Sequence, residues 1–349
     1  MAKNENLTRA KAGKNDEFYT QYNDIQDEMN AYHEFNPDAF RGKTVLLPCD
    51  DPAWSNFTEF FARNFKFYGL KKLITTSYAA ASRPNVPVRT LSKAELNNPS
   101  YDADLDPVHG RIYVVEPDEN GDVRVDLENI PWRYLEGDGD FRSAEVTALR
   151  DEADFVITNP PFSLFREFFK WVTASRVKFT LISNKNCVTF KEVFPMIRER
   201  RVWSGARSWS DFRFITPARN NLPVAVPAIW LTNIDHGRRH QPLDLQDMAR
   251  NLQTHSKMRG KTAYDRYDNY DAIEVPATMA IPSDWDGPMG VPISFLDKYC
   301  PEQFEIIGAT ESEGKGFSRG LWDRKSGVAQ ALINNQRVYK RIFIRRIRP

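Results

Sequence analysis

Cysteine is scarce in this chain of 349 residues. Its three cysteines, Cys49, Cys187 and Cys300, lie far apart and form no Cys-x-x-Cys pair. This spacing argues against a disulfide framework and against a zinc cluster, and it suits a reducing compartment. We therefore expect no metal site and a cytoplasmic location.

Long apolar runs are also missing. A membrane-spanning helix needs about 18 or more consecutive apolar residues, and the sequence contains no such run. The first residues, MAKNENLTRAKAGKNDEF, are polar and lack the apolar centre of a secretion signal. We expect no membrane partner and a disordered segment at 1–13. Hydrophobic residues still make up 41% of the chain, which is enough for a substantial core.

The chain has almost no net charge, but its charges are unevenly distributed. The formal charge is +1. Residues 95–160 hold 17 acidic and 5 basic side chains, whereas residues 196–266 hold 13 basic and 6 acidic ones, and residues 315–349 hold 10 basic and 1 acidic. Because phosphate contacts come mainly from Lys and Arg, the second half suits a polyanion such as nucleic acid. A solvated basic surface that pairs with the acidic half is the alternative.

Short apolar segments alternate with helical patterns up to about residue 235. Strands are expected at 45–47 and 155–158, and in LKKLITTSY, KFTLISN and PVAVPAIWLTN. One helix is expected to begin with Asp51 as its N-cap and Pro52 as its first residue, and others in SLFREFFKWVTAS and FKEVFPMIRERR. This alternation predicts an α/β fold, a mostly parallel sheet with helices on both faces. Beyond Asp235 the pattern weakens, which predicts a boundary near residue 236.

The stretch DFVITNPPFSLF, residues 154–165, ends a buried strand with a rigid corner. Pro161 has no N–H, so the carbonyl of Pro160 has no competing helical partner and can be fixed beside the side-chain oxygen of Asn159. Two such acceptors match the –NH₂ group of a base and favour positive charge on its nitrogen during attack on an electrophilic methyl group. Phe162 would stack on the base, which must first leave the duplex. A structural turn with Phe162 in the core is the alternative.

Several stretches, including this corner, resemble the EcoRI-type adenine-specific DNA methyltransferases over nearly the full length of the chain. The matching stretches are DEFYTQYNDI, CDDPAWSNFTEFF, NPPFSLF, YDNYDAIEV, MGVPISFLDKYCPEQFEIIG and RVYKRIFIRR. The resemblance implies a Rossmann-like methyltransferase fold with a mixed C-terminal DNA-recognition region. It also implies methyl transfer from S-adenosylmethionine to the N6 amino group of a flipped-out adenine in double-stranded DNA.

The resemblance divides the chain into a catalytic, cofactor-binding domain at 1–235 and a target-recognition region at 236–349. A separate restriction endonuclease, outside this chain, is a possible companion. Three other functions stay open at this point: methylation of RNA, methylation of protein glutamine, and nucleic-acid binding without catalysis. The large basic region argues against a protein substrate, and the intact catalytic motif argues against an inactive relative.

The resemblance also assigns roles to individual residues. The catalytic residues are Asn159, Pro160, Pro161 and Phe162. The N-terminal segment that covers the methionine part of the cofactor includes Tyr19 and Thr20. The loop after the first strand brings Pro48, Cys49 and Asp50, of which Asp50 would hold the cofactor ammonium. The remaining cofactor candidates are Ser55, Asn56, Phe57, Asp140 and Phe141.

Structural alternatives accompany the cofactor assignments. Tyr19 could instead anchor the N-terminus, the segment 55–57 could be first-turn packing, and the segment GDGDF could form a Gly-Asp turn. The sequence also departs from the wider superfamily. Leu-Pro-Cys-Asp-Asp replaces its Gly-rich loop, and the second strand ends TTSY, without the usual acidic residue for the ribose. Thr76 or Ser77 is the substitute that the sequence offers there.

The basic second half supplies the candidates for DNA contact. Arg and aromatic residues mix in RERRVWSGARSWSDFRF, where Phe212 or Phe214 could cover the other face of the flipped base or belong to the core. The backbone-contact candidates are Arg238, Arg239, Lys340, Arg341, Arg345 and Arg346. The segment RIFIRRI also fits an amphipathic edge strand with a solvated basic face, which is compatible with phosphate contacts.

Overall fold

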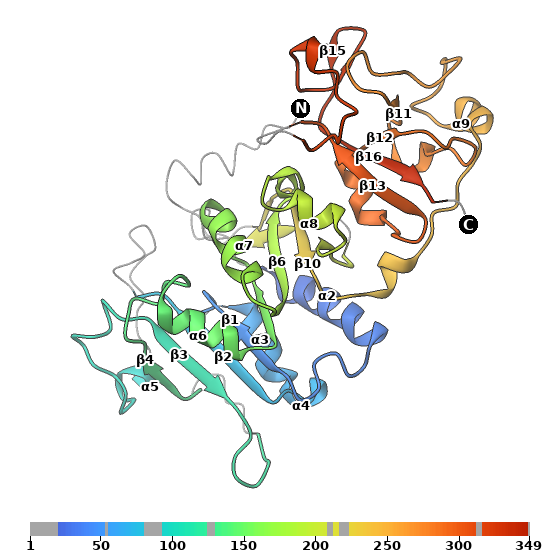
Figure 1. Ribbon diagram of the computed structural model, residues 1–349. Coiled ribbons are helices and arrows are strands. Elements are labelled where there is room, and N and C mark those ends of the chain that lie inside the picture. Colours follow the sequence, from blue (N-terminus) through green and yellow to red (C-terminus); the bar gives the residue numbers. More distant parts are fainter. Residues whose placement is uncertain are drawn as a thin grey trace. The chain divides into compact units, whose positions relative to one another are not determined.

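The computed structural model describes residues 20–52, 55–79, 93–123, 130–207, 212–215, 223–311 and 316–347 (Figure 1). Among these, Met1–Lys185 and Arg207–Asp235 contribute to one compact unit, and Asn186–Ala206 and His236–Pro349 to a second. The assignment of cofactor binding and DNA recognition to separate domains stays a prediction. Residues 1–13 and Tyr19 lie outside the described residues.

The first unit is built around one mixed sheet. Its strands lie in the order β4-β3-β2-β1-β5-β6-β10. The central strands β2, β1, β5 and β6 are parallel, whereas β3 and β10 run antiparallel to their neighbours. The strand bounds are Thr44–Leu47 (β1), Lys72–Ser77 (β2), Arg111–Val115 (β3), Trp132–Tyr134 (β4), Phe155–Thr158 (β5), Lys178–Asn184 (β6) and Ala228–Thr232 (β10). The α/β prediction is confirmed.

Helices cover both faces of this sheet because side chains alternate along each strand. Val45 and Leu47 of β1 belong to one core with residues of α2 (Tyr22–Phe35), α3 (Asn56–Arg63) and α4 (Phe65–Tyr68). On the other face, Phe169 of α7 (Phe165–Thr173) packs against Phe179 of β6. Helix α6 (Ala144–Glu152) lies beside α7, where the Trp171 Nε1 donates to the Thr147 hydroxyl at 3.1 Å (Figure 1). The short helix α5 spans Lys93–Leu96.

The expected start of the helix after β1 is wrong by about one turn. Helix α3 begins at Asn56, and its N-cap is Ser55, whose hydroxyl accepts hydrogen bonds from the N–H groups of Phe57 and Thr58. Asp51 instead supplies the carbonyl that accepts from the Ser55 N–H, at 2.8 Å. A turn therefore separates the strand end from the helix.

The segment PVAVPAIWLTN forms two strands and not one. Strand β9 (Pro223–Ala225) pairs with β8 (Arg213–Ile215), and β10 begins only at Ala228. Pro227 lies between them and has no N–H for a sheet ladder, which explains the break.

The second unit contains a four-stranded sheet in the order β11-β12-β16-β13. Strand β16 pairs with β12 on one side and with β13 on the other, so the interpretation of RIFIRRI as an edge strand is wrong. Ile342, Phe343 and Ile344 are all buried, as expected for an inner strand with both faces covered. The bounds in this unit are Trp203–Ser204 (β7), Ile273–Glu274 (β11), Met289–Pro292 (β12), Phe304–Ala309 (β13), Leu332–Ile333 (β14), Gln336–Arg337 (β15), Arg341–Arg346 (β16), Phe194–Arg198 (α8) and Met248–Thr254 (α9).

No helix within the described ranges is long and apolar enough to cross a membrane.

Candidate active site

The two predicted site segments lie at the point where the strand order of the first sheet reverses. From β1 the chain proceeds to β2 on one side, and from β5 it proceeds to β6 on the other, while β1 and β5 pair directly. Open α/β sheets bind ligands beyond the carboxyl ends of their strands at such a point. Pro48 to Asp50 follow β1 and Asn159 to Phe162 follow β5, so the fold places both segments at this edge.

Thr158, the last residue of β5, connects these segments. Its hydroxyl lies 2.9 Å from the Pro48 carbonyl oxygen and 2.6 Å from the Asp50 Oδ2. The next residue is Asn159, so the bond to Asp50 fixes the Asn-Pro-Pro corner beside the loop after β1. Thr158 was not among the sequence predictions, because a β-branched residue at the end of an apolar strand is ordinary strand composition.

Asp50 is a buried carboxyl group that hydroxyl groups surround. Its Oδ1 accepts a hydrogen bond from the Ser55 Oγ at 2.7 Å, in addition to the Thr158 contact. Burial raises the pKa of Asp50 from 3.8 to about 7, although both hydroxyls act to lower it. Among the described residues no cation pairs with this carboxylate. A ligand ammonium would supply the missing positive charge and favour the ionised form.

The backbone of Asp50 is fixed as firmly as its side chain. Its N–H donates to the Thr76 carbonyl at 2.9 Å, and its own carbonyl accepts from the hydroxyl of Thr58 at 3.1 Å and from that of Thr75. The preceding residue, Cys49, has a φ of 77°, a left-handed conformation that is uncommon outside glycine. The chain thus makes a sharp turn here without a Gly-rich loop, and the threonines of α3 and β2 hold it.

The N-terminal segment contacts the start of α3 through Thr20. The side-chain amide of Asn56 donates to the Thr20 carbonyl at 2.7 Å. Thr20 is only 4% exposed, and its hydroxyl has no hydrogen-bond partner within the described part of the chain. The buried Thr76 hydroxyl is in the same situation at the end of β2. Two of the predicted cofactor residues, Thr20 and Asn56, are therefore brought together, and both orphan hydroxyls could bond to a ligand.

Phe57 is buried in the core of the first unit. Its side chain is 2% exposed, and its ring meets the ring of Trp230 edge-on at a centroid distance of 6.0 Å. Its cofactor role stays a prediction, and the packing alternative accounts for its position.

The Asn-Pro-Pro corner leads from β5 into a short 3-10 turn. The Pro161 carbonyl accepts from the Leu164 N–H at 3.0 Å, which closes the 3-10 turn Phe162–Leu164. The Pro160 carbonyl accepts no hydrogen bond from the residues that the structure describes. Asn159 is half-buried, between the fully buried Thr158 and the buried Pro160.

Aromatic rings continue from the corner into the core. The half-buried Phe162 meets Phe214 edge-on at 6.1 Å, and Phe214 stacks on Phe212 at 5.7 Å with an interplanar angle of 10°. Phe212 and Phe214 are 2% and 0% exposed. This burial favours the core alternative for both rings, and their contact with a flipped base stays a prediction.

The segment GDGDF also lies at this edge of the sheet. Gly139 has a φ of 87°, and a side chain there would place its Cβ 2.3 Å from the Ser77 carbonyl oxygen at the end of β2. Phe141 is fully buried, with its ring 4.9 Å from that of Phe168 and 5.6 Å from that of Trp171. The close approach explains the glycine, and the burial of Phe141 supports the packing alternative for its ring.

The carboxyl group of Asp140 is paired within the protein. Arg142 contacts it at 2.5 Å and also reaches Glu167 at 2.6 Å. Burial raises the pKa of Asp140, but the hydrogen bonds from Arg142 outweigh this effect and hold the pKa below its ordinary value. Asp140 is therefore ionised at neutral pH and could accept a hydrogen bond from an adenine amino group.

Tyr78 is a second residue at this edge of the sheet that was not among the sequence predictions. It follows β2 directly, and burial, together with the nearby Cys49 and Asp140, raises its pKa far above the usual value. The neutral phenol thus lies between the loop after β1 and the GDGDF turn. The sequence signal that could have identified Tyr78 is an aromatic residue directly after the end of a strand.

Helix α2 holds the segment that carries Phe212 and Phe214. Arg207 pairs with Asp24 at 2.7 Å and with Asp27 at 2.8 Å, and its N–H donates to the buried Glu28 at 2.8 Å. One residue before the helix, the Gln21 amide donates to the Arg213 carbonyl at 2.7 Å.

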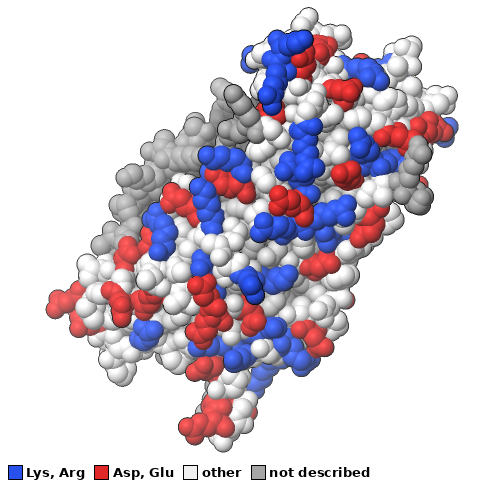
Figure 2. Space-filling model, viewed as in Figure 1, with Lys and Arg blue, Asp and Glu red and all other residues white. Residues whose placement is uncertain are grey.

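Several basic residues that were predicted to contact DNA have protein partners. Arg238 donates to the Ala206 carbonyl and to Asp297, both at 2.6 Å. The Arg239 guanidinium lies over the Trp203 ring, 3.9 Å from its centroid. Figure 2 shows basic and acidic side chains interspersed on the face in view. Contact with DNA stays a prediction for these residues. Within the described residues, no group of His, Cys, Asp and Glu could hold a metal ion.

Comparison with known proteins gives the family. A sequence model described as Adenine-specific methyltransferase EcoRI matches residues 6–347. The chain is 38% identical to the Type II methyltransferase M.EcoRI of Escherichia coli, over 97% of this chain and 99% of that protein. It is 34% identical to the Type II methyltransferase M.MpnI of Mycoplasma pneumoniae, over 86% of this chain and 84% of that protein.

No solved structure matches the chain. The family match and both relatives span most of the chain, including the edge of the sheet at which Asp50, Thr158 and Asn159 meet. The chain therefore belongs to the EcoRI family of adenine-specific DNA methyltransferases.

Proposed function

We propose that the protein transfers a methyl group from S-adenosylmethionine to the N6 amino group of an adenine that has been flipped out of double-stranded DNA. The observation that carries this proposal is the hydrogen bond between Thr158 and Asp50 at the reversal point of the sheet. This bond connects Asp50, whose carboxyl group suits a cofactor ammonium, with Thr158, the residue before Asn159. Donor and acceptor of the methyl group would then lie side by side.

The residues around Asp50 fit the methionine part of the cofactor. S-adenosylmethionine supplies an electrophilic methyl group on a positively charged sulfur. The buried Asp50 would bind the ammonium, and the unpartnered hydroxyls of Thr20 and Thr76 offer further hydrogen bonds. Asp140, kept ionised by Arg142, would accept from the adenine amino group of the cofactor. Tyr19, Pro48, Cys49, Ser55 and Asn56 complete the proposed cofactor segment.

The corner at the end of β5 would orient the target base. The Asn159 side-chain oxygen and the free Pro160 carbonyl would accept the two N–H groups of the adenine N6. As the nitrogen attacks the methyl group it gains positive charge, which two fixed acceptors stabilise without reorganisation. Phe162 would stack on the base, and Phe214 supports Phe162 from the edge. The product ammonium then loses a proton readily, so the corner needs no strong base.

The second unit would bind the DNA, because the C-terminal segment of the chain is strongly basic. The relatives are named Type II methyltransferases, which suggests a restriction–modification system. A separate endonuclease would then share the target sequence. We place the enzyme in the cytoplasm, where its DNA substrate is.

Labelled methyl transfer tests this proposal. The protein, tritiated S-adenosylmethionine and unmethylated duplex DNA should give label in N6-methyladenine after nucleoside analysis. RNA and protein extracts serve as competing substrates, and label found only in one of these would reject the proposal.

The Asn159→Ala variant tests the corner itself. Loss of a preorganised hydrogen-bonding group at a transition state costs on the order of 100- to 1000-fold in rate. We expect a loss of this size in single-turnover methyl transfer, with cofactor binding unchanged by calorimetry. Turnover equal to that of the unmodified protein would mean that the corner is only a structural turn.

A further inference from the structure

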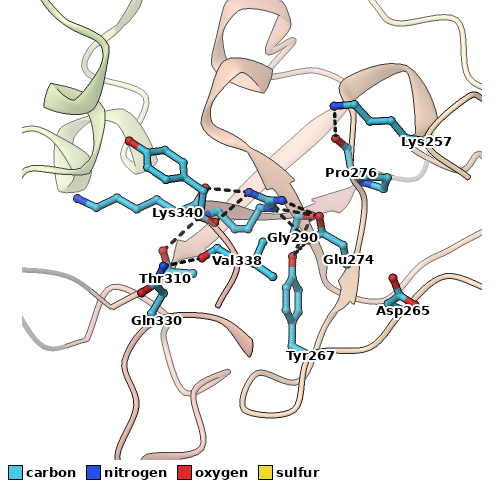
Figure 3. Close-up of polar contacts among 12 residues, drawn as sticks. Lys257, Asp265, Tyr267, Glu274, Pro276, Gly290, Thr310, Gln330, Val338 and Lys340 are labelled. Carbon is cyan, nitrogen blue, oxygen red and sulfur yellow. Dashed lines mark hydrogen bonds and ion pairs between the residues drawn. The ribbon is translucent and has the colours of Figure 1, made fainter. Parts of the chain in front are cut away.

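A buried ion pair in the second unit connects β11 and β16. The Arg341 guanidinium contacts both carboxylate oxygens of Glu274 at 2.7–3.2 Å, and the two side chains are 12% and 6% exposed. The Tyr267 hydroxyl also donates to Glu274 (Figure 3). In such a bidentate, buried ion pair, few N–H groups of Arg341 are left to bind a DNA phosphate.

Gly290 makes room for this arrangement. It lies on β12, between the strands that carry the two charges. A Cβ at this position would lie 2.2 Å from the Tyr267 hydroxyl oxygen. Figure 3 shows Tyr267 and Glu274 pointing toward one another beside Gly290. A side chain at position 290 would therefore displace the Tyr267 ring that donates to Glu274.

The remaining donor of Arg341 holds the backbone just before β16. Its Nη1 donates to the Tyr339 carbonyl at 2.9 Å and to the Lys340 carbonyl at 3.4 Å. The Arg341 N–H donates to the Thr310 hydroxyl at 3.2 Å, which fixes the start of the strand. One side chain therefore fixes the two residues that precede it.

These two residues carry side chains of the kinds that bind nucleic acid. Tyr339 is 55% exposed, although its ring is large and apolar, and its hydroxyl donates to the Asn186 Oδ1 at 2.5 Å. The Lys340 ammonium donates to the Thr189 hydroxyl at 2.8 Å and extends away from Glu274 (Figure 3). An exposed ring beside a cation, an amide and a hydroxyl matches the groups that contact bases and phosphates.

We propose that Tyr339 and Lys340 form a DNA-contact site, and that Arg341 and Glu274 are positioning residues that hold this site without touching DNA. The proposal rests on the proposed function, since it names residues of the same enzyme that bind its DNA. Charge supports DNA as the occupant: residues 315–349 carry 10 basic side chains and 1 acidic one. The proposal gives Lys340 and Arg341 different roles, although the sequence pattern groups them as one basic cluster.

DNA binding by surface variants tests the contact site. Fluorescence anisotropy would follow binding to a short duplex that the unmodified protein methylates, at several salt concentrations. Lys340→Ala should reduce the slope of log K against log salt by about 1, the value for one lost phosphate contact. Tyr339→Ala should weaken binding about tenfold with little change in this slope. Tyr339→Phe should bind nearly as the unmodified protein does.

Matched controls come from α4 of the first unit, at the amino-terminal side of β2. Lys66 and Phe67 are exposed, so Lys66→Ala and Phe67→Ala remove the same kinds of group elsewhere. Both controls should bind DNA normally. If Lys340→Ala and Tyr339→Ala also bind normally, the contact site is refuted, while methylation by the unmodified protein still supports the proposed function.

Glu274→Gln distinguishes positioning from direct contact. This change removes a negative charge, so an Arg341 that touched phosphate would bind DNA more tightly, whereas a positioning pair predicts weaker binding. Arg341→Ala should weaken binding with less change in salt slope than Lys340→Ala gives. Tighter binding by Glu274→Gln, with a full unit of slope lost in Arg341→Ala, would overturn the positioning role. Thermal unfolding of each variant shows whether the second unit stays folded. If Glu274→Gln or Arg341→Ala unfolds this unit, Lys340→Ala and Tyr339→Ala still test the contact site.

Discussion

At the scale of single residues, Asp50 is the group with the most unusual environment. It is buried among hydroxyls, with its pKa raised from 3.8 to about 7. Its position directly after an apolar strand made it predictable from the sequence. Its raised pKa was not predictable, because it comes from burial in the folded protein, which brings Asp50 beside residues far away in the sequence such as Thr158.

The pKa of Asp50 predicts how stability depends on pH. Between about pH 4 and pH 7 the folded protein keeps a proton that the unfolded chain has released, so stability falls as pH rises through this window. Above it the loss is complete, at most roughly 4 kcal/mol for a shift of this size. Asp50→Asn cannot ionise and should avoid the loss. Without cofactor, its free energy of unfolding should exceed that of the unmodified protein at pH 8 and approach it at pH 4.

Chemical denaturation at a series of pH values checks this prediction. Titrations of other groups are common to both proteins and cancel in the difference. A difference that stays constant from pH 4 to pH 8 would show that Asp50 titrates normally.

Cofactor binding should have the opposite pH dependence. Because the ammonium needs an ionised carboxylate, affinity for S-adenosylmethionine should rise as pH increases toward 7 and should then level off. Calorimetric titration of the unmodified protein and of Asp50→Asn measures this. The variant should bind weakly and lack the rise, and an equal rise in both proteins would assign the titration to another group.

At the scale of elements, strand ends were easier to predict than helices. Apolar runs that stop at Pro48 and at Asn159-Pro160 gave β1 and β5 to within one residue. The sequence pattern does not show α2, because the buried Asp24 and Glu28 interrupt its apolar stripe. Their partner Arg207 lies 179 residues from Glu28 in sequence, a pairing that no local pattern reveals. Likewise, the pairing of β16 on both sides depends on strands far away in the chain.

The link between α2 and Arg207 should be important for stability. Arg207→Ala would remove the guanidinium that pairs with the buried Asp24, and loss of one partner of a buried ion pair costs about 3 kcal/mol in comparable cases. Arg201→Ala is the matched control, since its exposed side chain contacts Glu199 only at 3.6 Å and should cost less than about 1 kcal/mol. Urea denaturation compares the two. Methyl transfer should also slow in Arg207→Ala, because the segment with Phe212 and Phe214 loses its ion pairs with α2. Equal stability of the two variants would contradict this role for α2.

At the scale of the whole molecule, the basic residues fall into two groups that the sequence cannot separate. Arg238 and Arg341 bond to acidic side chains of their own unit, whereas Arg345 is exposed and Arg346 half-buried on β16. Local charge counts treat all of them alike, since a count does not show which cations have protein partners. Affinity for DNA should therefore depend on fewer basic residues than the sequence contains.

Salt dependence tests this division. The unmodified protein should bind DNA with a steep loss of affinity as salt rises, and Arg345→Ala should reduce the slope of log K against log salt by about 1 while thermal stability is unchanged. Arg238→Ala should lower the melting temperature, because it breaks the contact with Asp297. At a temperature where this variant is folded, its salt slope should stay near that of the unmodified protein. A flat salt response in the unmodified protein would remove the basic second half from DNA binding altogether, and a reduced slope in Arg238→Ala would return that residue to the group of phosphate contacts.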